Sequence, residues 1–305
     1  MIENNAIVIL EDLNFGFKRG RFAIEKQVYQ NFEKALITKL NYLVFKDIQD
    51  YKMPGSVLNG YQLTDKFVSF DKMGKQTGAL FYVPAAYTSK IDPTTGFANL
   101  FNTRKCTNVE SRKVFLMTFD AINYDAMRKS FAFTFDYAKF QTSAKSFQNK
   151  WTVYTAQKRL VFNPLTRQDT TVNPTQMIVD ALNKHGVSLS EGFDLKAYLQ
   201  NTEAIKANAE FFKTIFTALE YTLQMRNSNT ISGEDYIESP VLNKSGEFFH
   251  SSEDNPALPI DADANGAYHI AMKGLFLLLN VFNQGKKDLK IEHQAWFEFM
   301  QKRNM

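Results

Sequence analysis

Cysteine is almost absent from this chain, since Cys106 stands alone among 305 residues. One cysteine cannot form an internal disulfide or build a cysteine-rich zinc site, so the sequence fits a reducing compartment such as the cytoplasm. The histidines are few and show no HxxxH or HxH spacing, which argues against a histidine-ligated metal. They are His185, His250, His269 and His293.

Long apolar runs and a strong charge excess are also lacking. No stretch approaches the roughly 20 apolar residues of a membrane span, and the first residues lack the basic and apolar regions of a signal peptide. We therefore expect a soluble protein with no membrane partner. The 36 Lys and Arg against 32 Asp and Glu give a net charge of +4, which is too small to indicate a nucleic-acid partner by itself. No glycine-rich phosphate loop occurs, so ATP is not implied.

What the chain does have is apolar surface: 44% of its residues are hydrophobic, and it contains 28 Phe and 13 Tyr. This is enough for one large domain or two ordinary ones, with most aromatic rings expected in the core. Residues 6–10 form an apolar run without alternation, which predicts a strand buried on both faces and ending at Glu11. A helix is predicted over residues 24–45 and a second strand over residues 79–83, stopped by Pro84. The opening is typical of an α/β sheet.

The pattern of apolar and polar residues is different between residues 87 and 259. Short aromatic strands, predicted at residues 131–135 and 151–154, alternate with polar loops and indicate a separate α+β insertion. Apolar spacing predicts a helix over residues 210–225, which places Arg226 at its carboxyl end. A polar linker at residues 251–259 leads to the last long helix, and Asp263 falls in its first turn.

Two carboxylates occupy positions that suit a metal ligand. A glutamate at the end of a buried strand and an aspartate opening a helix are rigidly supported oxygen donors, which Mg²⁺ prefers. Each position also has an ordinary explanation. Aspartate in a first helical turn complements the helix dipole, and a glutamate after a strand is often a solvated loop residue. Spacing alone leaves both interpretations of Glu11 and Asp263 open.

Several motifs, in the same order, resemble those of the type V-A CRISPR RNA-guided endonucleases, the Cas-twelve-a or Cpf-one family. The second RuvC motif of the family resembles ILEDLNFGFK at 9–18, EKQVYQ at 25–30 and KLNYLV at 39–44. The resemblance continues in order with MGKQTG at 73–78, YVPA at 82–85 and TSKIDP at 88–93. QMRNS at 224–228 and GEDY at 233–236 resemble the Nuc-domain signature, and DADANGAYH at 261–269 resembles the third RuvC motif. The resemblance covers the chain, loosely between residues 101 and 200.

The resemblance implies a partial RNase H-like (RuvC) domain, α/β in class, at residues 1–84 and 258–305, interrupted by an α+β Nuc domain at 85–257. Glu11 and Asp263 would be the second and third catalytic carboxylates, which hold two Mg²⁺ ions for phosphodiester hydrolysis. The shared aspartate of the family matches Asp263 and not Asp261.

The resemblance also assigns residues that handle DNA. Arg226 matches a Nuc arginine associated with cutting of the target strand, and its fork of donors suits a phosphate oxygen. The alternative is that Arg226 caps the helix before it by donating to the last carbonyls. Ser228 and Asp235 would support Arg226. The basic residues after the first strand, Lys18, Arg19 and Arg21, are candidate contacts to the DNA backbone.

One part of the family pattern has no match. The first catalytic aspartate of the family lies on an earlier strand, and nothing before Ile7 supplies it. The regions that bind guide RNA and read the PAM are also missing. We therefore expect the nuclease portion of a prokaryotic cytoplasmic protein, with the guide RNA bound through an amino-terminal portion. This nuclease portion would act on both DNA strands and would be inactive alone. The alternatives are a non-catalytic DNA-binding remnant and a complete small nuclease of a transposon-encoded lineage with a relocated first acid.

Overall fold

The computed structural model describes residues 8–12, 27–28, 31–32, 35, 42–43, 47–56, 59, 61–62, 80–163, 165–203, 208–229, 232–252, 257–284 and 291–303. The chain forms two compact units. The first contains residues 1–88 and 268–291, and the second contains residues 89–267 and 292–305. Assigning these units to RuvC and Nuc domains stays a prediction. The fold class is mixed α/β, with helices and several small sheets, as the sequence predicted.

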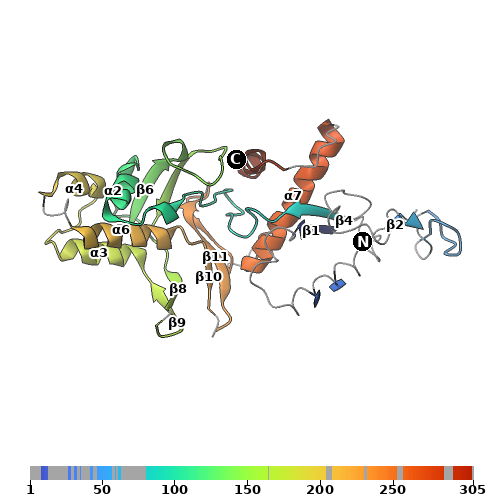
Figure 1. The fold of residues 1–305 in the computed structure, drawn as a ribbon, viewed down its shortest axis with the longest axis horizontal. Helices are drawn as coiled ribbons and strands as arrows, with labels where there is room; N and C mark the ends of the chain where they lie inside the picture. The colour runs from blue at the N-terminus through green and yellow to red at the C-terminus, as the bar shows by residue number, and fades with distance from the viewer. Residues whose placement is uncertain are drawn as a thin grey trace. The chain divides into compact units, whose positions relative to one another are not determined.

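The first unit is built on a pair of parallel strands. Strand β1 (Val8–Asp12) pairs with β4 (Leu80–Pro84), so that Glu11 lies opposite Val83. Both strands were predicted, but β1 is only half-buried from Val8 to Glu11 because β4 is its single partner among the described residues. The helix α7 (Ala262–Gln284) passes close to β1 (Figure 1). A Cβ added to Gly274 would lie 2.4 Å from the Ile9 side chain, so this contact requires glycine.

The helix predicted over residues 24–45 is only partly described. Residues 27–28, 31–32 and 35 are helical, but Val28 and Phe32 of its predicted apolar stripe are 61% and 60% exposed. The prediction is wrong at its end, because β2 (Tyr42–Leu43) is a short strand that pairs antiparallel with β3 (Tyr61–Gln62). A partner distant in sequence therefore overrides the local helical spacing there.

The second unit has a core of aromatic side chains. Its antiparallel sheet consists of β5 (Ala121–Asp125), β6 (Ser130–Asp136) and β7 (Lys150–Tyr154). Phe131, Phe133 and Phe135 alternate inward on β6 and are fully buried, which confirms the predicted strand and its core role. The hairpin of β8 (Arg159–Asn163) and β9 (Gln168–Val172) follows this sheet along the chain.

Four helices of the second unit begin at a polar side chain that caps them: α2 (Val109–Met117), α3 (Pro174–Asn183), α4 (Leu195–Asn201) and α6 (Ala209–Thr222). Helix α8 (His293–Arg303) also belongs to this unit. Asn173 caps α3, which has Pro174 at its first position, and Asn208 caps α6. Figure 1 shows α3 and α6 side by side, joined through the apolar faces of both helices. Two short 3-10 helices, at Thr103–Lys105 and Tyr137–Lys139, complete the helical part.

A three-stranded antiparallel sheet follows α6. It is formed by β10 (Arg226–Ser228), β11 (Asp235–Leu242) and β12 (Phe248–His250). The predicted helix over residues 210–225 is therefore three residues too long, and Arg226 is a strand residue rather than a helix end. None of the described helices combines the length and the apolarity that a bilayer crossing requires.

Candidate active site

Asp263 lies in the first turn of α7, where its carboxylate is 83% exposed. Asp261 has a different task, because its Oδ1 accepts a 2.6 Å hydrogen bond from the Ala264 amide and so caps the helix. The first turn is anchored by Asn265, whose Nδ2 donates to the Ile91 carbonyl at 3.0 Å. Of the two aspartates, Asp263 is thus the one that presents its carboxylate outward from a fixed turn.

Arg226 binds this carboxylate and a second one. Its Nε donates to Asp235 Oδ1 at 2.9 Å and its Nη2 to Asp235 Oδ2 at 2.6 Å, which is a bidentate pair. Nη2 also donates to Asp263 Oδ1 at 3.1 Å. The guanidinium therefore joins a strand of the β10–β11–β12 sheet to the first turn of α7.

The antiparallel register explains why Arg226 and Asp235 meet. Arg226 lies opposite Ile237 and Ser228 lies opposite Asp235, so Arg226 and Asp235 are diagonal neighbours on one face of the sheet. The hairpin between the strands includes Gly233 with a φ of +74°, a conformation that glycine adopts without strain. Ser228 is exposed at the end of β10.

The electrostatics of this cluster favour the charged arginine. Partial burial alone would lower the pKa of Arg226, but the hydrogen bond and charge of Asp235, with a contribution from Asp263, outweigh burial and raise the pKa. The side chains of Arg226 and Asp235 are 35% and 24% exposed. Because the three charged groups are accessible to solvent, they can meet a ligand without unfolding of the sheet.

The helix-capping role considered for Arg226 belongs to another arginine. Arg159, at the start of β8, donates from Nε to the Tyr221 carbonyl at 3.2 Å and from Nη2 to the Thr222 carbonyl at 3.3 Å. These are the last carbonyls of α6. Arg159 Nη1 also forms a 2.8 Å ion pair with Glu238 of β11, and the arginine side chain is fully buried. Nothing in the sequence singled out Arg159 as a capping residue, because an arginine at a strand start is usually exposed.

Arg159 lies in the layer that supports the β10–β11 pair. In the same layer, the Leu160 amide donates to Asn227 Oδ1 at 3.0 Å, and Gln224 Nε2 donates to the Leu160 carbonyl at 2.8 Å. These bonds tie β8 to the strand that carries Arg226. The chain is therefore held by partly buried polar contacts on both sides of Arg226.

Glu11 belongs to the first unit and Asp263 to the second, and each is placed within its own unit. Glu11 is the fourth residue of β1 and half-buried. The basic residues Lys18, Arg19 and Arg21 lie outside the described residues, as do 13–18 of the first motif and 73–78. Within the described ranges, no group of three or more His, Cys, Asp or Glu side chains is close enough to hold a metal ion.

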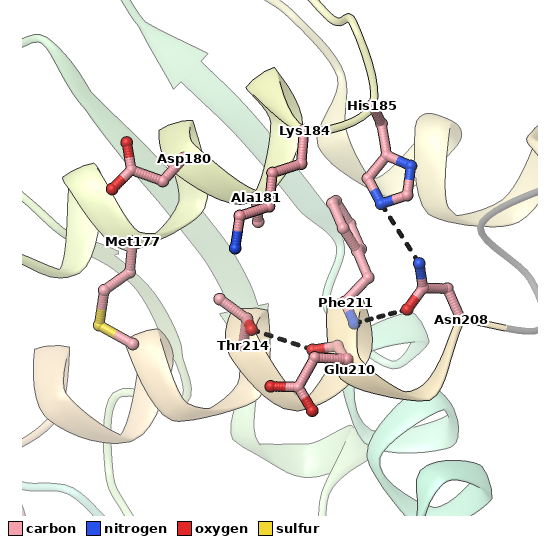
Figure 2. Close-up of a pocket in the computed structure, with 9 residues that line it drawn as sticks. All are labelled: Met177, Asp180, Ala181, Lys184, His185, Asn208, Glu210, Phe211 and Thr214. Carbon is pink, nitrogen blue, oxygen red and sulfur yellow. Dashed lines mark hydrogen bonds between the residues drawn. The ribbon is translucent and has the colours of Figure 1, made fainter.

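A small cavity of about 170 Å³ lies elsewhere in the second unit, between α3 and α6 (Figure 2). Its polar lining is engaged in helix structure: Asn208 caps α6 through Oδ1, and its Nδ2 lies 3.2 Å from His185 Nε2. None of the predicted site residues lines it. The cavity gives no geometry for nuclease chemistry, and Arg226 with its two carboxylates remains the stronger site.

The family model described as RuvC nuclease domain matches residues 1–305.

Proposed function

We propose that this chain, which belongs to the RuvC nuclease domain family, is the carboxyl-terminal nuclease portion of an RNA-guided DNA endonuclease of type V-A. In this proposal Glu11 and Asp263 are two of three metal-binding carboxylates, and an amino-terminal portion contributes the third together with the guide RNA. The family membership supports a nuclease-type function. The RNA-guided class rests on the resemblance of the motifs.

One observation carries the proposal. Arg226, from the segment similar to the Nuc signature, donates at 3.1 Å to Asp263, from the segment similar to the third RuvC motif. The two motifs lie 37 residues apart in the chain. A charged phosphate-binding group and a metal-binding carboxylate belong together in a site that cuts phosphodiesters, because both act on the same phosphate. Asp235 contributes by fixing the guanidinium from behind.

RuvC nucleases generally use divalent metal ions, and the donor chemistry here is suited to them. Glu11 and Asp263 offer carboxylate oxygens, the ligands that Mg²⁺ prefers, and Asp263 presents its carboxylate to solvent. Glu11 and Asp263 would help to hold the Mg²⁺ ions, which when bound would supply activation of the attacking water and stabilisation of the leaving 3′ oxygen. The need for a third carboxylate fits an amino-terminal contribution, because two carboxylates provide little negative charge for two divalent ions.

Arg226 would position the DNA. Among the described residues, its contacts with Asp235 and Asp263 occupy Nε and Nη2, which leaves Nη1 to meet a phosphate oxygen. The bidentate partner holds the plane of the guanidinium, so that the remaining donors point in a fixed direction. Loss of the guanidinium should therefore slow the cutting of the DNA strand that Arg226 positions, and it should disturb the binding of metal ions less.

A non-catalytic DNA-binding remnant is the second candidate function. It is favoured by the ion pair itself, because Arg226 satisfies Asp263 without a metal. Such a module would bind DNA through the arginine and cut neither strand, even when an amino-terminal portion is present.

Arg226→Ala is tested in a nuclease reconstituted with its amino-terminal portion, guide RNA and Mg²⁺. We expect this substitution to slow cutting of the target strand far more than cutting of the non-target strand. Loss of one charge-assisted phosphate contact costs about 1.5–3 kcal/mol, which corresponds to a roughly ten- to hundredfold slowing. Rates of both strands are measured on end-labelled DNA under single-turnover conditions.

Arg128→Ala is the matched control, because Arg128 forms a similar, partly exposed ion pair with Asp125 in the same unit. This control should leave the ratio of the two rates unchanged. A lower melting temperature for Arg226→Ala with an unchanged ratio would show that Arg226 only holds Asp235 and Asp263 together.

A further inference from the structure

A lysine in the first unit has no role in the site described so far. Lys273 lies on α7, and only 1% of its surface is exposed. Its Nζ donates to the Pro84 carbonyl at 2.8 Å and also to the Ala86 carbonyl. A buried ammonium is strongly destabilising unless hydrogen bonds replace its water. These two carbonyls provide such bonds, so Lys273 ties α7 to the chain that leaves β4.

The segment that Lys273 holds is a strained turn. Residues 85–88 follow β4 directly, and Tyr87 has a φ of +56°, which a residue other than glycine rarely adopts. Such a conformation is strained and persists only where the surroundings fix it. Thr88 Oγ1 supplies one restraint through a 2.8 Å bond to the Ala85 carbonyl. The ammonium of Lys273 supplies two more, to the carbonyls on either side of Ala85.

This turn begins at the carboxyl end of β4, the same edge of the strand pair at which Glu11 lies. In the parallel pair, Glu11 lies opposite Val83, and Asp12 lies opposite Pro84. The carboxyl ends of both strands therefore meet beside the Lys273 ammonium. Consistent with this, burial lowers the pKa of Lys273 to about 8, while the negative charge of Glu11 opposes that shift. The close contact of Gly274 with Ile9 fixes this turn of α7 against β1.

We propose that Lys273 is a positioning residue of the nuclease site: it clamps the turn at residues 85–88 against α7 and thereby fixes the edge of the β1–β4 pair that presents Glu11. The inference rests on the proposed function for its effect on catalysis, because Glu11 is assigned there as a metal ligand. The clamp itself rests only on the contacts within the first unit.

The clamp is tested first in the purified chain. Lys273→Met keeps the length of the side chain but removes both hydrogen bonds. We expect hydrogen exchange at the amides of residues 85–88 to accelerate at least about tenfold more than exchange elsewhere in the first unit, and Lys273→Arg to restore most of the protection. Leu277→Ala, a buried apolar change on the same helix, is the control for general loosening. Equal acceleration across the first unit in Lys273→Met and Leu277→Ala would overturn the clamp.

The catalytic consequence is tested in the reconstituted nuclease. Lys273→Met should slow the cutting of both strands by about ten- to a hundredfold and raise the Mg²⁺ concentration for half-maximal rate, with guided DNA binding unchanged. Lys273→Arg should recover most of the rate. An unchanged or lower Mg²⁺ requirement in Lys273→Met would overturn the positioning role. If the wild-type complex itself does not cut DNA, the proposed function fails, and the exchange experiment still decides the clamp.

Discussion

Glu11→Ala and Asp263→Ala, each made in the reconstituted nuclease, are expected to reduce cutting of both DNA strands to background. Each change removes a carboxylate that the proposed site needs to hold two divalent ions together, and one set of ions serves both strands. Guided DNA binding should stay nearly intact, because the heteroduplex is held by other surfaces. Single-turnover cleavage and a filter-binding measurement on the same preparations check both statements.

Asp261→Asn is the matched control for Asp263→Ala. Asp261 caps α7 through the Ala264 amide, and asparagine serves as a cap nearly as well as aspartate. The control should therefore cut DNA at close to the wild-type rate. If Glu11→Ala or Asp263→Ala lost DNA binding as severely as cutting, these residues would be structural and their assignment as metal ligands would be wrong.

Arg159→Met should destabilise the second unit by about 3–5 kcal/mol in the free energy of unfolding. The change removes the Arg159 guanidinium from the largely buried Glu238 carboxylate, and it removes the donors to the Tyr221 and Thr222 carbonyls. The lost ion pair also removes the tie between β8 and β11, while the bonds of Leu160 to Asn227 and Gln224 remain. Urea-induced unfolding, followed by circular dichroism, measures the loss.

Two variants make the Arg159 result specific. Arg128→Met breaks an ion pair that is more exposed, with side chains 26% and 22% accessible, and should cost about 1 kcal/mol or less. Arg159→Met combined with Glu238→Leu removes both charges and should recover part of the loss, since an apolar replacement leaves no unpaired buried charge. A cost for Arg159→Met as small as that for Arg128→Met would contradict the buried-pair account.

The sequence predicted the elements whose signals are local. The apolar runs that became β4 and β6 are short and bounded by proline or polar residues, so period and length agree. Asp263 was placed in a first helical turn because a polar, small-residue opening precedes a long apolar body. In these cases the deciding contacts involve near neighbours in the chain.

The errors and omissions have non-local causes. Arg226 was placed at a helix end, but pairing of β10 with β11 across a hairpin draws it into a strand. Leu43 continued a helical spacing and instead pairs with Tyr61. Arg159 and Lys273 were not recognised, because a lone basic residue carries no signal of burial. Their hydrogen-bond partners lie 62 residues or more away in the chain, except for the Lys158 carbonyl next to Arg159.

The most direct measurement is a cleavage assay of this chain with guide RNA, target DNA and Mg²⁺, in the presence and absence of a co-expressed amino-terminal portion that carries the first RuvC aspartate. We predict no guided cutting by the chain alone, because the proposed site would then lack one of its three carboxylates, and we predict cutting of both strands once the portion is added. Robust metal-dependent cutting by the purified chain, or no cutting by the assembled complex, would contradict the account.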